Sequence, residues 1–291
     1  MLCLEEIIIK EENKVSEVTH APFSVLMSVY VNENEEYFRQ CMESILQQTI
    51  CPNEILIIKD GPVKPGIDQA IEEYSKENLG LIKVIAFETN HGLGFALNKG
   101  VEAAANELIA RMDTDDVSRR DRFEKQLYEF ERNPQLDICG SQIDEFENNV
   151  ENIVARRHVP TTDAAIKKYQ KRRDGLNHVS VMFKRSAVLR AGNYQSCPLM
   201  EDTYLWVRMF MAGATCMNID EALVYVRIGQ GMYERRGGWK YFKLYKEGRK
   251  KVYQTGYIGK KDYYVTLIVQ LIVALLPAKI RGSIFKKVLH R

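Results

Sequence analysis

Short apolar segments alternate with amphipathic ones along the first part of the chain. The segments FSVLMSVY (23–30) and EILIIKDG (54–61) are rich in residues that favour strands. Between them, Phe38, Met42 and Ile45 recur at spacings of three and four, which is typical of one face of an amphipathic helix. A strand, a helix and a strand of these lengths predict a βαβ unit.

The same alternation continues to residue 113. Residues 66–78 and 94–106 have helical patterns, and each is followed by an apolar strand-like segment, 81–88 and 108–113. Nearly continuous apolar strands that alternate with helices are typical of a mostly parallel sheet with helices on both faces. The predicted fold class is therefore α/β.

Further elements follow, although the pattern no longer says how they pair. Pro134 and Gly213 each mark the end of a helix. The predicted elements are a helix over 122–134, a strand over 137–147, a helix over 161–173, a strand and then a helix within 178–194, and a helix over 200–213.

Polar side chains follow three of the first four strands. Tyr30 comes after the first strand, Asp60 after the second, and the acidic loop DTDD (113–116) after the fourth. In open α/β sheets, ligands bind outside the carboxyl ends of the strands. We therefore expect these residues to meet at one edge of the sheet and form a site.

Four interpretations of the acidic loop are open. A calcium-binding EF-hand would need an oxygen ligand at Val117 and glycine at Ser118. A haloacid-dehalogenase-type phosphatase would use Asp113 as nucleophile and Asp115 as acid/base, but its motif follows a first strand. A solvated surface loop is the third interpretation. The fourth is a carboxylate pair that holds Mg²⁺ or Mn²⁺ on a nucleotide diphosphate, because these hard cations prefer carboxylate and phosphate oxygens.

The last quarter of the chain is basic and partly apolar. A glycine-rich loop (227–238) carries Arg235 and Arg236, and residues 278–291 hold five basic residues and no acidic one. The apolar segment 263–277 is shorter than the roughly 20 residues that span a bilayer. Basic residues on both sides of it favour a helix that lies in a membrane interface.

Composition narrows the functional classes. The net charge of +2 argues against general nucleic-acid binding. The six cysteines include no CxxC pair, so neither a zinc site nor a disulfide framework is predicted. Glu5 and Glu6 interrupt the stretch where a signal peptide needs an apolar run, which favours a cytoplasmic location.

Several motifs in a fixed order carry a family resemblance. The chain resembles the inverting family 2 glycosyltransferases of the GT-A fold, particularly those of bacterial capsule, exopolysaccharide and O-antigen synthesis. The resemblance covers roughly residues 22–228 and departs from the family at Lys59, where many members have a second Asp. The matching segments are SVLMSVYVNENEEYFRQCMESILQQT, EILIIKDG, NHGLGFALNKG, IARMDTDD, HVSVMFKRSAVLRAGNY and MEDTYLW.

The resemblance implies a UDP-sugar donor and a role for each matching residue. Asp60 would accept a hydrogen bond from the uracil N–H, and Tyr30 would form part of the base pocket. Asn90, Gly92 and Asn98 would shape the floor of the sugar-nucleotide site. From the residues alone, an Asp-Gly turn is the alternative interpretation of Asp60.

The acidic loop would match the DxD motif of that family. Asp115 would bind Mn²⁺ or Mg²⁺ directly, and Asp113 would contact the ribose or a metal-bound water. Thr114 lies between them, and Asp116 is a second ligand or supports the first. The metal would offset the charge that builds on the departing UDP.

The resemblance also implies the catalytic base. Asp202 would deprotonate the acceptor hydroxyl, next to Glu201. Taken alone, both residues are more typical of a helix N-terminus than of a catalytic site. His178 is a weaker candidate for positioning the acceptor or a phosphate. Arg235 and Arg236 are weaker candidates for closing over the diphosphate.

These features lead to one functional hypothesis. Residues 1–21 form a lead segment, 22–228 a GT-A catalytic domain, and 229–291 a membrane-associating extension. The enzyme would transfer one sugar to a lipid-linked or saccharide acceptor on the inner face of the cell membrane. The alternatives are a metal-dependent phosphatase and an inactive glycosyltransferase-like membrane scaffold. The sequence leaves the donor sugar, the linkage and the oligomeric state open.

Overall fold

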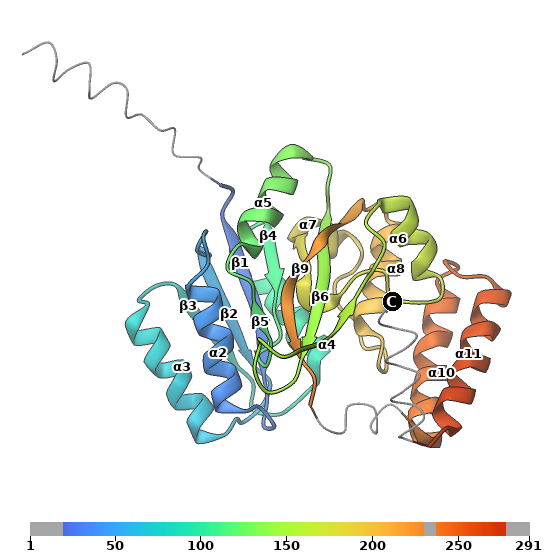
Figure 1. The fold of residues 1–291 in the computed structure, drawn as a ribbon, viewed down its shortest axis with the longest axis horizontal. Helices are drawn as coiled ribbons and strands as arrows, with labels where there is room; N and C mark the ends of the chain where they lie inside the picture. The colour runs from blue at the N-terminus through green and yellow to red at the C-terminus, as the bar shows by residue number, and fades with distance from the viewer. Residues whose placement is uncertain (1–19, 230–236, 278–291) are drawn as a thin grey trace, which may run out of the picture.

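The computed structural model describes residues 20–229 and 237–277. Their centre is a nine-stranded sheet in the order β3-β2-β1-β4-β8-β6-β9-β5, with β7 paired to β6 (Figure 1). The strands are β1 (Phe23–Val29), β2 (Glu54–Lys59), β3 (Ile82–Ala86), β4 (Leu108–Arg111), β5 (Val117–Ser118), β6 (Ile138–Phe146), β7 (Ile153–Arg157), β8 (Met182–Lys184) and β9 (Cys216–Arg227).

The first four strands are parallel to one another, as the βαβ pattern predicts. Successive side chains of a strand point to opposite faces of the sheet, so Val25 and Met27 enter one apolar core and Leu26 enters the other. Both faces of the sheet are therefore covered, which explains why β1 and β2 read as continuous apolar runs.

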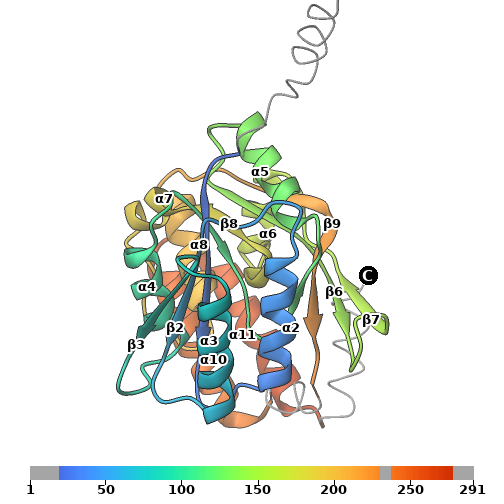
Figure 2. The ribbon, with the colours of Figure 1, turned by 90° about the vertical axis from the view of Figure 1, so that its left-hand side faces the viewer.

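Helices cover both faces of this sheet. Figure 2 shows α2 and α3 side by side over the strands. The helices that contribute to the first core are α2 (Glu35–Leu46), α3 (Pro65–Glu77) and α5 (Arg122–Arg132). Those that contribute to the second are α4 (Leu93–Ala103), α6 (Asp163–Gln170), α7 (Arg185–Arg190) and α8 (Glu201–Met211), and a short 3₁₀ turn, η1 (His178–Ser180), precedes β8.

Beyond β4 the sheet is mixed. β8 runs antiparallel to both β4 and β6, whereas β6 and β9 are parallel. β5 is antiparallel to β9. The α/β class is confirmed, while the strands β5, β7 and β9 lie in segments where the sequence pattern predicts no strand. Their pairing depends on contacts between segments far apart in the chain, which a local pattern does not record.

Two helices follow the sheet, α10 (Gly238–Gln254) and α11 (Lys260–Leu275), beside α8 in Figure 1. Val252 and Ile258 share a small buried cluster with Val207 of α8 and Met200. The predicted helical character of this region is therefore confirmed, and part of it packs against α8.

Candidate functional site

The carboxyl ends of β1, β2 and β4 open into one cavity of about 730 Å³, which we call the acidic-loop cavity. Tyr30, Asp60, Asn90, Gly92 and residues 113–115 all line it. The structure thus brings together the residues that follow three separate strands. Tyr30 is 40% exposed, so the face of its ring is accessible to a ligand.

Asp60 holds the loop that forms one wall of this cavity. Its two carboxylate oxygens accept hydrogen bonds from the backbone N–H groups of His91 and Gly92, each at 2.8 Å. The side-chain amide of Asn90 donates to the Asp60 carbonyl at 3.1 Å. Gly61 has a φ of +87°, and a Cβ there would lie 2.8 Å from the backbone nitrogen of Asn90, so the turn requires glycine. Asp60 therefore has a structural function besides any contact with a base.

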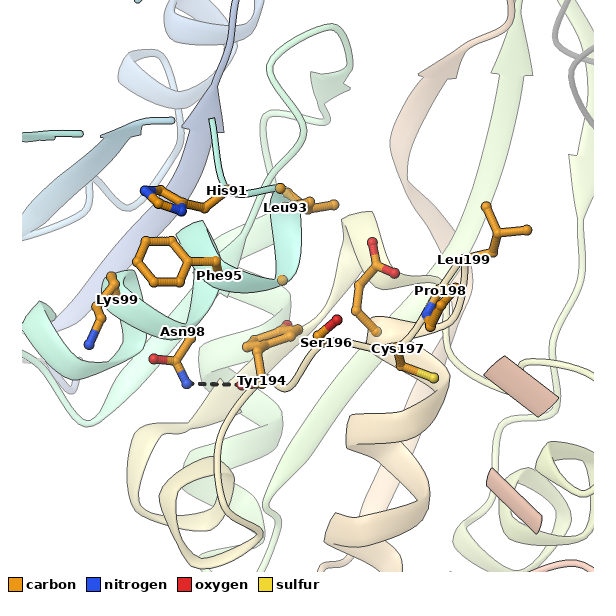
Figure 3. Close-up of a pocket in the computed structure, with 13 residues that line it drawn as sticks. His91, Leu93, Phe95, Asn98, Lys99, Tyr194, Ser196, Cys197, Pro198 and Leu199 are labelled. Atoms are coloured by element: carbon orange, nitrogen blue, oxygen red, sulfur yellow. Dashed lines mark hydrogen bonds between the residues drawn. The ribbon is translucent and has the colours of Figure 1, made fainter. Parts of the chain in front are cut away.

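A second cavity of about 530 Å³, the α4 cavity, adjoins the first at Gly92 and Leu93 (Figure 3). Asn98 lines this second cavity and not the first. Its Nδ2 donates to the Tyr194 carbonyl at 2.9 Å, which ties α4 to the segment after α7. Of the three predicted floor residues, Asn90 and Gly92 thus line the acidic-loop cavity, whereas Asn98 of α4 lines the α4 cavity.

The acidic loop is held by two arginines. The buried guanidinium of Arg111 donates to both oxygens of Asp113. Asp116, only 3% exposed, accepts from the backbone N–H of Arg227 at 2.7 Å. Arg227 Nε also donates to the Asp115 carbonyl at 3.0 Å, so the loop is fixed at three of its four residues.

Negative charge accumulates where these side chains meet. Burial raises the pKa of Glu33 to about 7, aided by the charges of Asp115 and Asp113, although a hydrogen bond with Thr114 acts in the opposite direction. Burial and the charge of Asp113 also raise the pKa of Asp115. Glu33 was not predicted, but it follows the first strand in the acidic segment NENEE and therefore lies at the same sheet edge.

These carboxylates fit a divalent ion that is shared with a ligand. Within residues 20–229 and 237–277, no three His, Cys, Asp or Glu side chains form a complete metal site. Asp113 is already paired with Arg111, which leaves Asp115 and Glu33 as carboxylates with raised pKa. Mg²⁺ commonly binds one or two carboxylates together with substrate phosphates. A cation here would also relieve the repulsion between the negative charges of Asp115 and Glu33.

A third cavity of about 380 Å³, the Asp202 cavity, joins the acidic-loop cavity at Asp113 and Leu93. Asp202 and Glu201 line it from the first turn of α8, where the helix dipole favours anions. The Asp202 carboxylate accepts from the backbone N–H of Thr203 at 2.7 Å.

Asp202 has the electrostatic properties of a base that works near neutral pH. Burial, followed by the charges of Asp174 and Glu201, raises the pKa of Asp202 to about 7, whereas the Thr203 N–H and Arg111 act in the opposite direction. Burial also raises the pKa of Glu201. A base with a pKa near the working pH transfers protons most effectively.

His178 lines the same cavity but is held by its neighbours. Its Nε2 is 2.8 Å from the Tyr194 hydroxyl, and its ring packs edge-on against Trp206. Burial and the charge of Arg111 lower the pKa of His178, so the ring is neutral at pH 7. It therefore offers a hydrogen bond rather than a positive charge. Trp206 is fully buried in the second core.

Four arginines differ in how the sequence and the structure describe them. Arg235 and Arg236 lie outside the described residues. Arg111 and Arg227 were not predicted as site residues, although an arginine inside the apolar strand β4 is itself a signal that a buried acid lies nearby. Arg227 carries no comparable signal, because its partners are far away in the sequence.

Comparison with known proteins gives a family. A family model described as glycosyl transferase family 2 matches residues 24–194. An uncharacterized glycosyltransferase of Haemophilus influenzae is 37% identical over 92% of this chain and 99% of its own length. A protein of Escherichia coli named UDP-Gal:alpha-D-GlcNAc-diphosphoundecaprenol beta-1,3-galactosyltransferase is 35% identical over 92% of this chain and 97% of its own length.

Two solved structures share this fold, which confirms the predicted GT-A class. A mannosyltransferase from Pyrobaculum calidifontis, in complex with GDP-Man and Mn²⁺, aligns with a TM-score of 0.62 over 93% of this chain and 76% of its own, at 13% identity. S. aureus TarS 1–349, in complex with UDP-GlcNAc, aligns with a TM-score of 0.59 over 91% of this chain and 71% of its own, at 15% identity.

Proposed function

The chain belongs to glycosyl transferase family 2, and from that premise we propose that it transfers one sugar from a UDP-sugar to a lipid-linked sugar acceptor with inversion. The observation that carries the proposal is the junction of two cavities at Asp113. One cavity holds the acidic loop, and the other holds Asp202, a carboxylate with a pKa of about 7.

The donor is assigned to the acidic-loop cavity. Its volume of about 730 Å³ is in the range of small-molecule sites, and Tyr30 and Asp60 lie at the strand ends where nucleotides bind. The name of the Escherichia coli relative specifies a UDP-Gal donor and a diphosphoundecaprenol-linked acceptor. That name supports a UDP-sugar donor and a lipid-linked acceptor for this chain.

The acceptor is assigned to the Asp202 cavity. Asp202 takes the proton of the acceptor hydroxyl while that oxygen attacks the anomeric carbon from the face opposite UDP. The carbon–oxygen bond to UDP breaks in the same displacement, and its electron pair leaves on the diphosphate. One base is sufficient, because the leaving group departs as an anion rather than as an alcohol that must be protonated.

Asp115 and Glu33 would hold a Mn²⁺ or Mg²⁺ ion, and Arg111 keeps Asp113 oriented toward the donor. The chemistry that such an ion supplies is neutralisation of charge on the departing diphosphate. Asp116 would support the loop through the hydrogen bond that its carboxylate accepts from the backbone N–H of Arg227.

The C-terminal helix is assigned to the membrane surface. Two polar side chains of α11 face the protein, since Asp262 pairs with Arg172 at 2.7 Å and Thr266 accepts from Arg249 at 3.0 Å. Five of its large side chains are mostly exposed instead, with exposed fractions between 55% and 67%. They are Tyr264, Ile268, Val269, Ile272 and Leu275, which we call the α11 face. Such an apolar face next to basic segments suits an anionic lipid surface.

No helix among the described residues is long and apolar enough to cross a bilayer. The α11 face would therefore rest in the interface rather than span it, and five basic residues in 278–291 would add attraction to anionic lipids. In this proposal the catalytic domain spans 22–228 and the extension spans 229–291. The enzyme acts as a peripheral protein on the inner face of the membrane, where a lipid-linked acceptor is presented.

The test is a screen of UDP-sugars with Mn²⁺ and lipid-diphosphate-linked GlcNAc as acceptor. We expect turnover with one donor, an inverted anomeric configuration in the product, and loss of turnover in Asp202→Asn. Asp220→Asn removes the same charge at an exposed position outside all three cavities and should leave turnover unchanged.

Each alternative has its own outcome in that experiment. UDP binding without turnover of any donor would support the inactive scaffold. Phosphate release from simple esters, with no acceptor present, would support the phosphatase. Turnover that survives Asp202→Asn would contradict the assignment of the base.

A further inference from the structure

Thr203 links Asp202 to a second carboxylate. Its backbone N–H donates to Oδ1 of Asp202 at 2.7 Å, and its hydroxyl donates to Oδ1 of Asp174 at 2.5 Å. Thr203 is 4% exposed, so both bonds form away from bulk water, where they are stronger. Asp174 and Asp202 line the same cavity, although they come from the segment before η1 and from α8.

Asp174 is itself held in place. Gln170, at the end of α6, donates from Nε2 to Asp174 Oδ1 at 2.9 Å. The same Gln170 side chain accepts from the backbone N–H of Gly175 at 2.8 Å, and Arg157 donates to the Asp174 carbonyl at 3.2 Å. Gln170 and Thr203 thus hold Oδ1 of Asp174, and the other contacts hold the backbone beside it, so its charge has a defined position relative to Asp202.

Other charged groups also face Asp202, and the effect of Asp174 must be separated from theirs. Glu201 adds a negative charge from the same helix turn, and Arg111 adds a positive one from β4. His178 is neutral for the reason given above. The remaining charged groups that line the cavity are Asp113, Asp116, Glu145 and Arg157.

We propose that Asp174 is a positioning residue that orients Asp202 through Thr203 and whose negative charge strengthens Asp202 as a base. The proposal rests on the proposed function, because it assigns the proton of the acceptor hydroxyl to Asp202. Of the charges that raise the pKa of Asp202, that of Asp174 has the largest effect, after burial. A carboxylate in water would be protonated only near pH 4 and would be a weaker base.

Asp174→Asn separates charge from geometry. The amide oxygen of asparagine can still accept from Thr203 and Gln170, so the hydrogen bonds remain while the charge is lost. The titration of Asp202 can be followed directly by ¹³C NMR in the full-length protein labelled at aspartate carboxyls, with the signal assigned by its absence in Asp202→Asn. No substrate is needed for this measurement.

We expect the titration midpoint of Asp202 to fall by about half a unit to one unit in Asp174→Asn. In turnover assays, the acid limb of kcat/KM should move to lower pH by the same amount. Asp174→Glu retains the charge and should keep the midpoint near that of the unmodified protein. Asp220→Asn removes an equal charge outside the cavity and should leave the midpoint unchanged.

Coincident midpoints for Asp174→Asn and the unmodified protein would overturn the proposal. A fall of the same size in Asp220→Asn would also overturn it, because the effect would then be general. These results are distinguishable from failure of the proposed function. If Asp202→Asn retains turnover, the base assignment fails; if it loses turnover while Asp174→Asn shows no shift, only the inference about Asp174 fails.

Discussion

The backbone N–H of Arg227, the last residue of β9, donates to Oδ1 of Asp116 at 2.7 Å across 111 positions of sequence. The side chain of Arg227 continues the contact, since its Nε donates to the Asp115 carbonyl and its Nη2 donates to Gln40 at 2.6 Å. Its guanidinium also lies 3.8 Å from the centre of the Tyr37 ring. The end of the sheet therefore determines the shape of the acidic loop.

The first prediction concerns this arginine. Arg227→Met keeps the backbone bond to Asp116 but removes the side-chain bonds to Asp115 and Gln40, so the loop should lose its fixed shape. We expect the KM for the UDP-sugar to rise about tenfold, which corresponds to ~1.4 kcal/mol. Arg227→Lys should recover part of the loss, because lysine keeps the charge but not the planar donor geometry. Initial-rate kinetics at saturating acceptor measure both effects.

Arg156→Met is the matched control for this measurement. Arg156 also forms a two-point ion pair, with Asp144, but it is half exposed on β7 and lines none of the three cavities. Its loss should leave the donor KM unchanged. Equal effects of the two substitutions would show that Arg227 acts through general stability rather than through the acidic loop.

The second prediction separates the two roles of Asp60. In Asp60→Asn, one of the two backbone N–H groups of His91 and Gly92 must face an amide NH₂ instead of an acceptor. Asp60 is 2% exposed, so the free energy of unfolding should fall by about 1–3 kcal/mol in the absence of any ligand. Urea denaturation measures this loss. Asp68→Asn, which disrupts a surface pair with Lys59, should cost much less; equal losses would contradict the structural role.

The sequence predicts much of this site because its residues follow strands. Tyr30, Asp60 and the acidic loop come directly after apolar runs, and parallel strands bring their carboxyl ends together. Arg227 is different, because β9 approaches the acidic loop only through its pairing with β5 and β6. A local pattern contains no record of that pairing.

Sequence analysis predicts neither the role of Asp174 nor the orientation of α11, and the reasons are related. Asp174 lies in the basic segment KRRDG, where nothing marks it as the neighbour of Asp202. Asp262 and Thr266 are polar residues of a mostly apolar helix, but the sequence leaves open which side of that helix faces the protein. The partners Arg172 and Arg249 decide that question, and they belong to other elements of the fold.

The third prediction follows from the raised pKa of Asp202. The pKa of its carboxyl is about 7 in the folded protein, against 3.8 for an aspartate side chain in water. Between these two pH values the folded state binds a proton that the unfolded state does not, so the contribution of this group to stability falls as the pH rises. Asp202→Asn lacks this dependence. Relative to the unmodified protein, the variant should become progressively more stable between pH 5 and pH 7, by up to about 1.4 kcal/mol per pH unit, and the difference should level off above pH 7.

Urea denaturation of both proteins at several pH values tests this prediction. Groups that do not interact with Asp202 titrate alike in both proteins and cancel in the difference of the free energies of unfolding. A difference that stays constant across this range would show that Asp202 has an ordinary pKa.

The fourth prediction tests the α11 face as a membrane-contacting surface. Ile268 and Ile272 are 58% and 56% exposed, so replacing both with Glu should not disturb the fold. Burial of each in a lipid interface would contribute about 1.5 kcal/mol or more. In sedimentation with anionic phosphatidylglycerol vesicles, the double variant should therefore bind about a hundredfold more weakly, because two such residues together contribute about 3 kcal/mol.

Leu79→Glu provides the control, because Leu79 is 87% exposed in the turn between α3 and β3, away from α11. That substitution should leave vesicle binding unchanged. Added salt should weaken vesicle binding of the unmodified protein, because its basic segments are attracted to the anionic lipids by charge. Equal binding by the double variant and the unmodified protein would exclude the α11 face as the lipid-contacting surface.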